Sequence, residues 1–332
     1  MILDMTRIDD HIHPARRRLL AAAVLAACSG GLRAQPASNV ARIIVPFAAG
    51  GAREMPARVV QQDLNQETGL NWIIENKPGA GGAIGTVYVG QSAPDGMTLL
   101  MAASSHFVTA AMGPKPHYDP VKDFVPVANF GEQNYVLIVQ SALRVNNAGE
   151  LIALAKKQPG AFNYGSAGIA SSTHLAGAYF CSMAGIQMVH IPFKGTQEAA
   201  NDVVGGRCHA VFVPTAGAGP YLVDTRVKAI GITSPKRAPL LPNVPAIAES
   251  GLQGYEFESW FGLLAPAKTP PAIVARLNAA VNKVVGKPEI RDKLMKLGID
   301  PNPLLPTQFN KLFLADRDLM VRVVKESGIT RE

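Results

Sequence analysis

The chain has 332 residues, of which 48% are hydrophobic and 17% are charged. This length allows one large domain or two ordinary ones, and the low share of charged residues excludes an intrinsically disordered chain. The 32 Lys and Arg residues outnumber the 25 Asp and Glu residues, which gives a formal charge of +7. Because these cations are scattered and do not alternate with aromatic residues, we expect an ordinary basic surface and no nucleic-acid partner.

Residues 1–34 have the pattern of an export signal. A cluster of arginines precedes the apolar run 19–27, which is too short to span a membrane. Two processing sites compete: a signal-peptidase site after Ala34, which we favour, and a lipobox-like segment that would place a lipid on Cys28. In either case we expect the mature chain in the periplasm, soluble or anchored by that lipid.

Short apolar runs alternate with amphipathic segments along the rest of the chain. The apolar runs predict strands at residues 43–47, 72–75, 98–102, 135–139, 162–164, 188–191, 210–213 and 228–232. Capping residues and helical spacing predict helices from about residue 52 and at 148–157, 173–184, 271–285, 289–297 and 307–325. This alternation favours an α/β fold whose mostly parallel sheets are covered by helices.

Two extended passages interrupt the alternation, at residues 119–139 and 255–265. They fit two α/β domains that are joined by a pair of crossing strands. The expected domain 1 comprises residues 39–137 and 256–332, because the last helices return to it. Domain 2 then comprises residues 138–255.

The turns that follow the first strands carry small and polar residues. Gly50 and Gly51 lie between a strand and a helix, where backbone N–H groups can approach a ligand closely. Ser104 and Ser105 follow the strand predicted at 98–102. In an open parallel sheet, ligands bind at the carboxyl ends of the strands, and helix N-termini there attract anions.

The second predicted domain repeats this arrangement. Ser166 and Gly168 follow the strand at 162–164, and Ser171, Ser172 and Thr173 stand where the next helix begins. Each loop taken alone also fits a plain tight turn or a helix cap. Several such loops in one chain instead indicate two domains that hold a small carboxylate between them.

Enzymatic alternatives receive less support from the sequence. Glycines in the segment 79–85 imitate a dinucleotide turn, but no acidic residue follows the next strand to bind a ribose. A serine hydrolase would pair Ser166 or Ser171 with His174, yet Ser166 lacks the glycine two residues earlier that a nucleophile elbow requires. A histidine that packs within the fold is the simpler interpretation of His174, and of His190 at the end of a strand.

We expect neither a metal nor a cofactor. The spacing of the cysteines and histidines matches no metal-binding pattern. After loss of the signal, the mature chain keeps Cys181 and Cys208, which an oxidising compartment could pair, although cysteines at such helix-like and strand-like positions are more often small buried hydrophobic residues.

Several motifs in a fixed order resemble one family. They include "IVPFAAGG", "ENKPGAGGAIG", "YGSAGIASSTHLAG", "LPNVPAIAESG" and "GYEFESWFGLLAPAKTP", spread over residues 42–328. In combination they are similar to the solute-binding receptors of tripartite tricarboxylate transporters, also called Bug-type proteins. The resemblance implies a type II periplasmic-binding-protein fold that closes on a small carboxylated solute by a hinge motion.

The resemblance also implies which residues form the ligand site. From the first domain it implies a wall at Phe47, backbone donors at Ala49, Gly50 and Gly51, and hydroxyls at Ser104 and Ser105. From the second domain it implies that the carboxylate is held by Ser166, Gly168, Ser171, Ser172 and Thr173. At the far end of the pocket it places Lys194, Gly195, Thr196 and Asp202, and on the second hinge strand Trp260.

The chain departs from the family pattern beside the first glycine turn. Glu54 stands where the family usually has Asp, and Arg53 before it is unusual. A cation at this place could favour a more acidic ligand, while an ordinary surface arginine is the other interpretation.

The predicted function is a periplasmic, non-enzymatic receptor for a small organic carboxylate. A di- or tricarboxylate and a carboxylated aromatic are the ligands expected. The receptor would act as a monomer and deliver its solute to a large and a small integral-membrane transporter subunit. The alternative partner is the outer domain of a histidine kinase, which would make the chain a sensory ligand-binding protein.

Overall fold

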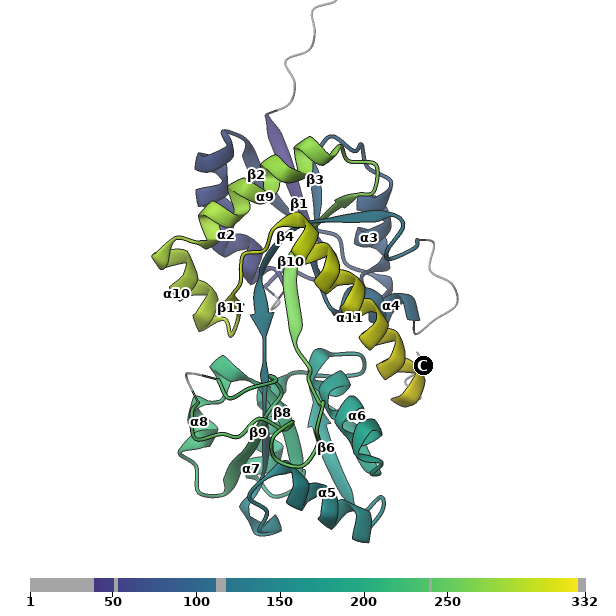
Figure 1. The fold of residues 1–332 in the computed structure, drawn as a ribbon, viewed down its shortest axis with the longest axis vertical. Coiled ribbons are helices and arrows are strands. Elements are labelled where there is room, and N and C mark those ends of the chain that lie inside the picture. Colours follow the sequence, from purple (N-terminus) through teal and green to yellow (C-terminus); the bar gives the residue numbers. More distant parts are fainter. Residues whose placement is uncertain (1–38, 51–52, 112–117, 239–240, 328–332) are drawn as a thin grey trace, which may run out of the picture. The chain divides into compact units, whose positions relative to one another are not determined.

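The computed structural model describes residues 39–50, 53–111, 118–238 and 241–327 (Figure 1). Val40–Glu332 forms one compact unit. The expected export signal, with Cys28, and the predicted ligand residue Gly51 lie outside the described residues. Within the described ranges, no helix combines the length and the apolar character that crossing a membrane requires.

A six-stranded sheet forms the centre of the first lobe, in the order β2-β1-β3-β10-β4-β11. Strands β1, β2 and β3 pair in parallel, whereas β10 runs antiparallel to both β3 and β4, and β11 is antiparallel to β4. The strands are β1 (Val40–Val45), β2 (Asn71–Asn76), β3 (Thr98–Ala103), β4 (Phe124–Gln133), β10 (Ser259–Pro266) and β11 (Asp300–Pro301).

Helices from both ends of the chain cover this sheet. They are α2 (Met55–Thr68), α3 (Ala83–Gly90), α4 (Ser105–Ala111), α9 (Pro271–Val285), α10 (Pro288–Lys296) and α11 (Pro306–Ser327). The sequence favours α9 because Pro270 and Pro271 begin it and an apolar stripe that includes Leu277 and Val281 packs on the sheet. The same apolar cluster contains the buried Trp72 of β2.

A five-stranded sheet forms the second lobe, in the order β7-β6-β8-β5-β9. Strand β6 is parallel to β7 and β8, and β5 is antiparallel to β8 and β9. The strands are β5 (Tyr135–Gln140), β6 (Phe162–Ser166), β7 (Met188–Pro192), β8 (Ala210–Pro214) and β9 (Val227–Ile232). The helices are α5 (Ala148–Lys157), α6 (Ser172–Ala184), α7 (Thr196–Val204) and α8 (Gly219–Leu222).

The chain crosses between the lobes in two neighbouring passages (Figure 1). The first passage leads from β4 through Asn134 directly into β5. The second returns before β10, where Phe257 N–H donates to Thr233 O at 3.0 Å. These two passages are the pair of crossing strands expected from the sequence, and the family resemblance implies that they act as a hinge.

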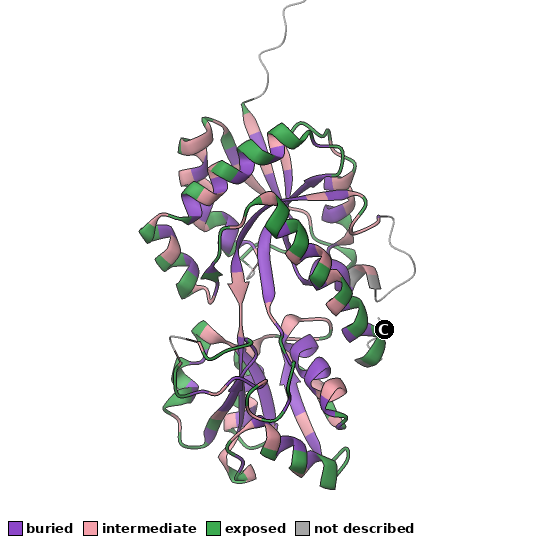
Figure 2. Cartoon of the chain, viewed as in Figure 1, coloured by how far each residue is buried: buried purple, intermediate pink, exposed green. Residues whose placement is uncertain are grey.

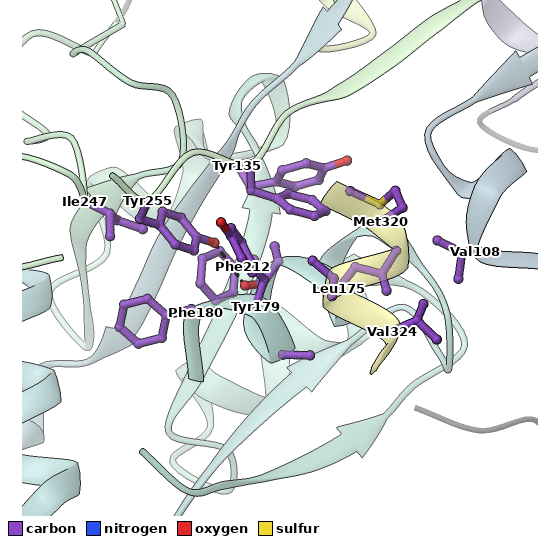
Figure 3. Packing of buried hydrophobic residues seen from close by; sticks show 14 of the residues in the cluster. Val108, Tyr135, Leu175, Tyr179, Phe180, Phe212, Ile247, Tyr255, Met320 and Val324 are labelled. Atoms are coloured by element: carbon purple, nitrogen blue, oxygen red, sulfur yellow. Dashed lines mark hydrogen bonds between the residues drawn. The ribbon is translucent and has the colours of Figure 1, made fainter. Parts of the chain in front are cut away.

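Helix α11 also contacts the second lobe. Its Met320 and Val324 belong to the same buried cluster as Leu175 of α6 and Val108 of α4 (Figure 3). Figure 2 shows that the central strands of both sheets are buried, while the outer faces of the helices are exposed. The C-terminal helix therefore packs on both lobes beside the hinge.

The structure confirms the predicted strands and the later helices to within a few residues. Helix α2 begins at Met55, later than residue 52, and α3, α4, α7 and α8 were not predicted. Both sheets contain antiparallel pairs as well as the expected parallel ones, because the crossing strands β4, β5 and β10 run against their neighbours. Since β5 belongs to the second sheet from Tyr135 onward, we propose a boundary between the domains at Asn134.

Candidate functional site

The loop after β1 is shaped by a buried carboxylate. Glu54 precedes α2, and its side chain turns back to accept hydrogen bonds from Gly50 N–H at 2.7 Å and from Asn76 Nδ2 at 3.2 Å. Arg58, one turn later in α2, forms an ion pair with the same carboxylate. Asn76 also donates to Phe47 O at 3.0 Å. Glu54 thus fixes the loop from inside the lobe.

These contacts change the role expected for Gly50. Its N–H is occupied by Glu54, so it is not a free donor for a ligand in this structure. Burial alone would raise the pKa of Glu54, but the hydrogen bonds from Gly50, Arg58 and Asn76 lower it below its ordinary value. The carboxylate is therefore ionised at neutral pH.

Ser104 and Ser105 follow β3 but face different surroundings. Ser104 is only 2% exposed, accepts a hydrogen bond from Trp260 N–H at 3.2 Å and bonds the carboxyl group of Asp316. It therefore ties β3 to the hinge strand β10 and to α11, and does not offer a hydroxyl to the cleft. Ser105 lines a small cavity together with Phe47.

The start of α6 is organised by its own hydroxyl groups. The Ser171 hydroxyl caps the helix by accepting from His174 N–H at 3.2 Å. Thr173 Oγ1 accepts from Ala167 N–H at 2.9 Å and lies 3.0 Å from Ser171 Oγ. Ser172 hydrogen-bonds the hydroxyl of Tyr135 on the first crossing strand. This network directs the helix N-terminus toward the space between the lobes.

Beneath this loop lies a stack of aromatic rings. The Ser166 hydroxyl is fully buried and lies 2.6 Å from His190 Nε2. The rings of His190 and His174 stack with centroids 3.7 Å apart, and His174 Nδ1 accepts from Ala170 N–H at 3.1 Å. Burial lowers the pKa of His174 to about 3 and that of His190 to about 4.

This stack does not have the geometry of a serine hydrolase. A nucleophile must reach its substrate, and the Ser166 hydroxyl is 0% exposed. Ser171 uses its hydroxyl to cap α6, while the ring of His174 contacts Ala170 and His190. Ser166 and the two stacked histidines instead support the loop between β6 and α6, because Ser166 Oγ also accepts from Gly168 N–H at 3.1 Å.

A cavity of about 460 Å³ opens between the two lobes. The first lobe contributes Arg53, Ala103, Phe261, Lys296 and Leu297 to its lining. The crossing passage contributes Gln133 and Tyr135, and the second lobe contributes Ala167, Ser171, Ser172, Thr173, Thr196, Pro214, Ala216 and Gly217. Among the described residues that line it, none is Asp or Glu.

Of the predicted residues Lys194, Gly195, Thr196 and Asp202, Thr196 alone is among the residues that line this cavity. Thr196 begins α7 and lines the cavity beside its neighbour Gly195, but Lys194 is exposed and Asp202 forms an ion pair with Arg207 at the other end of α7. Asp202 lies six positions after Thr196, and its carboxylate is engaged by Arg207 there. The expected contribution of Asp202 to the pocket is therefore not supported.

A second, smaller cavity adjoins the first at Arg53, which lines both. The Arg53 guanidinium lies over the Phe47 ring, 4.4 Å from its centroid. His106, 6% exposed, also lines the small cavity, and its Nε2 contacts Pro120 O at 2.9 Å. Burial lowers the pKa of His106 to about 4, so Nε2–H donates to Pro120 and the ring is neutral at pH 7.

The sequence did not indicate every lining residue. Gln133, Tyr135 and Phe261 lie on the crossing strands, which were predicted, but nothing in the pattern showed which of their side chains point into the cleft. Lys296 and Leu297 lie at the end of α10, which is distant in sequence from the loops that were predicted to bind the ligand. Arg53 was noticed in the sequence, yet its position between two cavities depends on the loop geometry that Glu54 sets.

Two lobes with sheets of this topology, a two-passage hinge and a cavity between them define a periplasmic binding protein of type II. The model of the tripartite tricarboxylate transporter family receptor matches residues 56–329. The chain therefore belongs to this family of solute-binding receptors, in agreement with the resemblance seen in the motifs.

Individual relatives agree with this assignment. Protein BugT of Bordetella pertussis is 31% identical over 290 residues, covering 86% of this chain and 89% of BugT. The structure is similar to Rpa4515 of R. palustris with adipate, with a TM-score of 0.73 and 30% identity, covering 89% of this chain and 99% of that one. It is also similar to MatC of Rhodopseudomonas palustris with bound malate, with a TM-score of 0.69 and 30% identity over 86% and 98% of the chains.

Proposed function

We propose that this receptor binds a small organic carboxylate in the cavity between its lobes. The observation that carries the proposal is the chemistry of the lining: a helix N-terminus with hydroxyl groups at residues 171–173 faces a cationic Arg53, and no described lining residue is acidic. Helix N-termini and arginine both favour anions over neutral solutes. The adipate and malate of the two similar receptors support this class of ligand.

Within the predicted site, we assign two kinds of role. Direct contact with the ligand is proposed for Phe47, Ala49, Ser105, Gly168, Ser171, Ser172, Thr173, Gly195 and Thr196. Support of the loops is proposed for Gly50, Ser104 and Ser166, whose polar groups are engaged within the protein.

A thermal-shift titration tests the ligand class. Purified protein is mixed with adipate, malate, citrate, benzoate and, as an uncharged control, dimethyl adipate. A ligand present at 100 times its Kd stabilises the folded state by about 2.7 kcal/mol, which corresponds to a rise in Tm of roughly 4 °C for a chain of this size. Stabilisation by dimethyl adipate equal to that by adipate would contradict carboxylate recognition.

We further propose that the protein acts in the periplasm and delivers its solute to a transporter with a large and a small integral-membrane subunit. Membership in a transporter receptor family supports this partner. Deletion of the receptor should abolish uptake of the radiolabelled ligand identified above, and its return should restore uptake. Unchanged uptake together with a lost transcriptional response to the ligand would instead favour the histidine-kinase partner.

A further inference from the structure

Arg53 occupies the border between the two cavities of the site. It lies between the loop after β1 and the start of α2, is half-buried, and its guanidinium stacks on the ring of Phe47. An arginine held over an aromatic face keeps its N–H groups free at the edges of the guanidinium plane. Those groups are available to the space that both cavities share.

The charge of Arg53 has no protein counter-ion in the described part of the chain. Its neighbour Glu54 points the other way, to Gly50, Asn76 and Arg58. No described Asp or Glu lies within ion-pair distance of Arg53, and none lines either cavity. A half-buried cation without a partner loses solvation that an anion would compensate.

Nearby titratable groups do not change this charge balance. Burial lowers the pKa of Arg53 to about 10 and that of His106 to about 4, while it raises the pKa of Tyr135 to about 12. At neutral pH, Arg53 is therefore a cation, and both of these neighbours are neutral. The first-lobe side of the site offers two cationic side chains near the helix start of the second lobe, the exposed Lys296 at the end of α10 and the half-buried Arg53, and Arg53 is the one that lines both cavities.

We infer that Arg53 binds a second acidic group of the ligand, so that the receptor selects dicarboxylates over monocarboxylates. This inference rests on the proposed function, because it assumes that one carboxylate lies at the start of α6. The planar fork of arginine pairs with the two oxygens of a carboxylate, and Phe47 fixes its orientation. An uncharged or singly charged ligand leaves Arg53 unpaired in the closed cleft.

Matched ligands and one substitution test the inference. Linear diacids from succinate to suberate are titrated calorimetrically into the protein, each beside the monoacid of equal length, such as hexanoate beside adipate. We expect the wild type to prefer the best diacid by at least about tenfold, the ratio that one charge-assisted hydrogen bond can provide. Arg53→Gln should lower diacid affinity by a similar factor and leave monoacid affinity within about threefold, so that the preference disappears.

Two further variants separate local from general effects. Arg53→Lys keeps the charge but not the fork, and should retain part of the preference. Lys268→Gln removes an exposed positive charge in the turn after β10, outside both cavities, and should leave the preference unchanged. The melting temperatures of the unliganded variants confirm folding, and Arg53→Lys carries the test if Arg53→Gln does not fold.

The possible results distinguish the two proposals. Equal affinity for diacid and monoacid, or a uniform loss of both in Arg53→Gln, would overturn the role of Arg53 and leave the carboxylate receptor standing. Binding of neither class would overturn both. Binding of monoacids alone would support a carboxylate receptor and contradict the inferred selectivity.

Discussion

At the scale of single residues, Glu54, which replaces the Asp usual in the family, determines the shape of the loop at the site. Its longer side chain reaches Gly50, Asn76 and Arg58 together, and it has no exposed surface. An ionised group in such a position is tolerated because charge-assisted hydrogen bonds replace its water. The loop that carries Phe47 and Arg53 therefore depends on one carboxylate.

We expect Glu54→Ala to destabilise the fold by about 2–4 kcal/mol, because it leaves buried donors without an acceptor. Arg58→Ala should cost less, about 1 kcal/mol, because half of that side chain is exposed and the carboxylate keeps its other bonds. Urea unfolding of both variants measures the difference. Equal losses would show that Glu54 matters only through Arg58.

A second residue-scale prediction concerns Asp316 on α11. Burial raises its pKa to about 7, although Trp260 Nε1–H donates to it at 2.7 Å and Ser104 also bonds it. Since the folded state then holds a proton that the unfolded state releases near pH 4, this group makes stability fall as the pH rises from 4 to 7. Above pH 7 it is ionised in both states, and its effect is constant.

Asp316→Asn should remove this dependence. Between pH 4.5 and 6.5, the free energy of unfolding of the wild type should fall, relative to that of the variant, by up to about 1.4 kcal/mol per pH unit. Comparing the two proteins cancels other groups that titrate in this range, such as Glu258, whose pKa burial raises to about 7. Parallel pH profiles would show that Asp316 is ionised in the folded protein.

At the scale of helices and strands, the sequence predicted those elements that a local pattern of residues determines. The strands 43–47 and 210–213 are continuous apolar runs, and α5 begins where Asn147 and Glu150 form reciprocal hydrogen bonds, so their placement follows from composition and caps. Helices α3 and α4 were missed because glycines and serines begin them, and these residues are equally typical of turns.

The candidate ligand site was also predictable only in part. Serines at the start of α6 were recognised by position, and three of the hydroxyl-bearing residues there do line the cavity. Which polar group is free and which is engaged depends on partners distant in sequence: Ser104 bonds Trp260, and Ser166 bonds His190. A single sequence does not contain those pairings in any local pattern.

The position of α6 depends on a glycine in its middle. A Cβ on Gly177 would lie 2.3 Å from the ring of Tyr164 on β6, so the helix approaches the sheet more closely than any other residue allows. We expect Gly177→Ala to cost about 1–3 kcal/mol through overpacking, despite the better helix propensity of alanine. Gly219→Ala in α8, where no atom lies within 4 Å, should change stability by less than about 0.5 kcal/mol. Thermal unfolding measures both, and a stabilised Gly177→Ala would contradict the packing.

At the scale of the whole molecule, the chain links the two lobes in two crossing passages, the arrangement expected of a receptor that closes on its ligand. The cavity is lined from both lobes and from Tyr135 between them, so a ligand that contacts both sides stabilises the closed arrangement over the open one. Trp260 joins β10 to α11 through Asp316, so the crossing strand and the C-terminal helix are held together in this structure.

The charges that Arg53 and His106 bring to the cleft do not change near neutral pH. Arg53, with a pKa of about 10, and His106, with a pKa of about 4, keep their charge states from pH 6 to 8.5, and the carboxylates of simple diacids are ionised there. We therefore expect the Kd for the best diacid to vary by less than about threefold across this range, and to rise below pH 5 as the ligand itself is protonated. Calorimetric titration in buffers of different ionisation enthalpy should also detect no proton uptake at pH 7. A Kd that changes tenfold between pH 6 and 8 would instead show that a group with a pKa near 7, such as Asp316 or Glu258, contributes to binding.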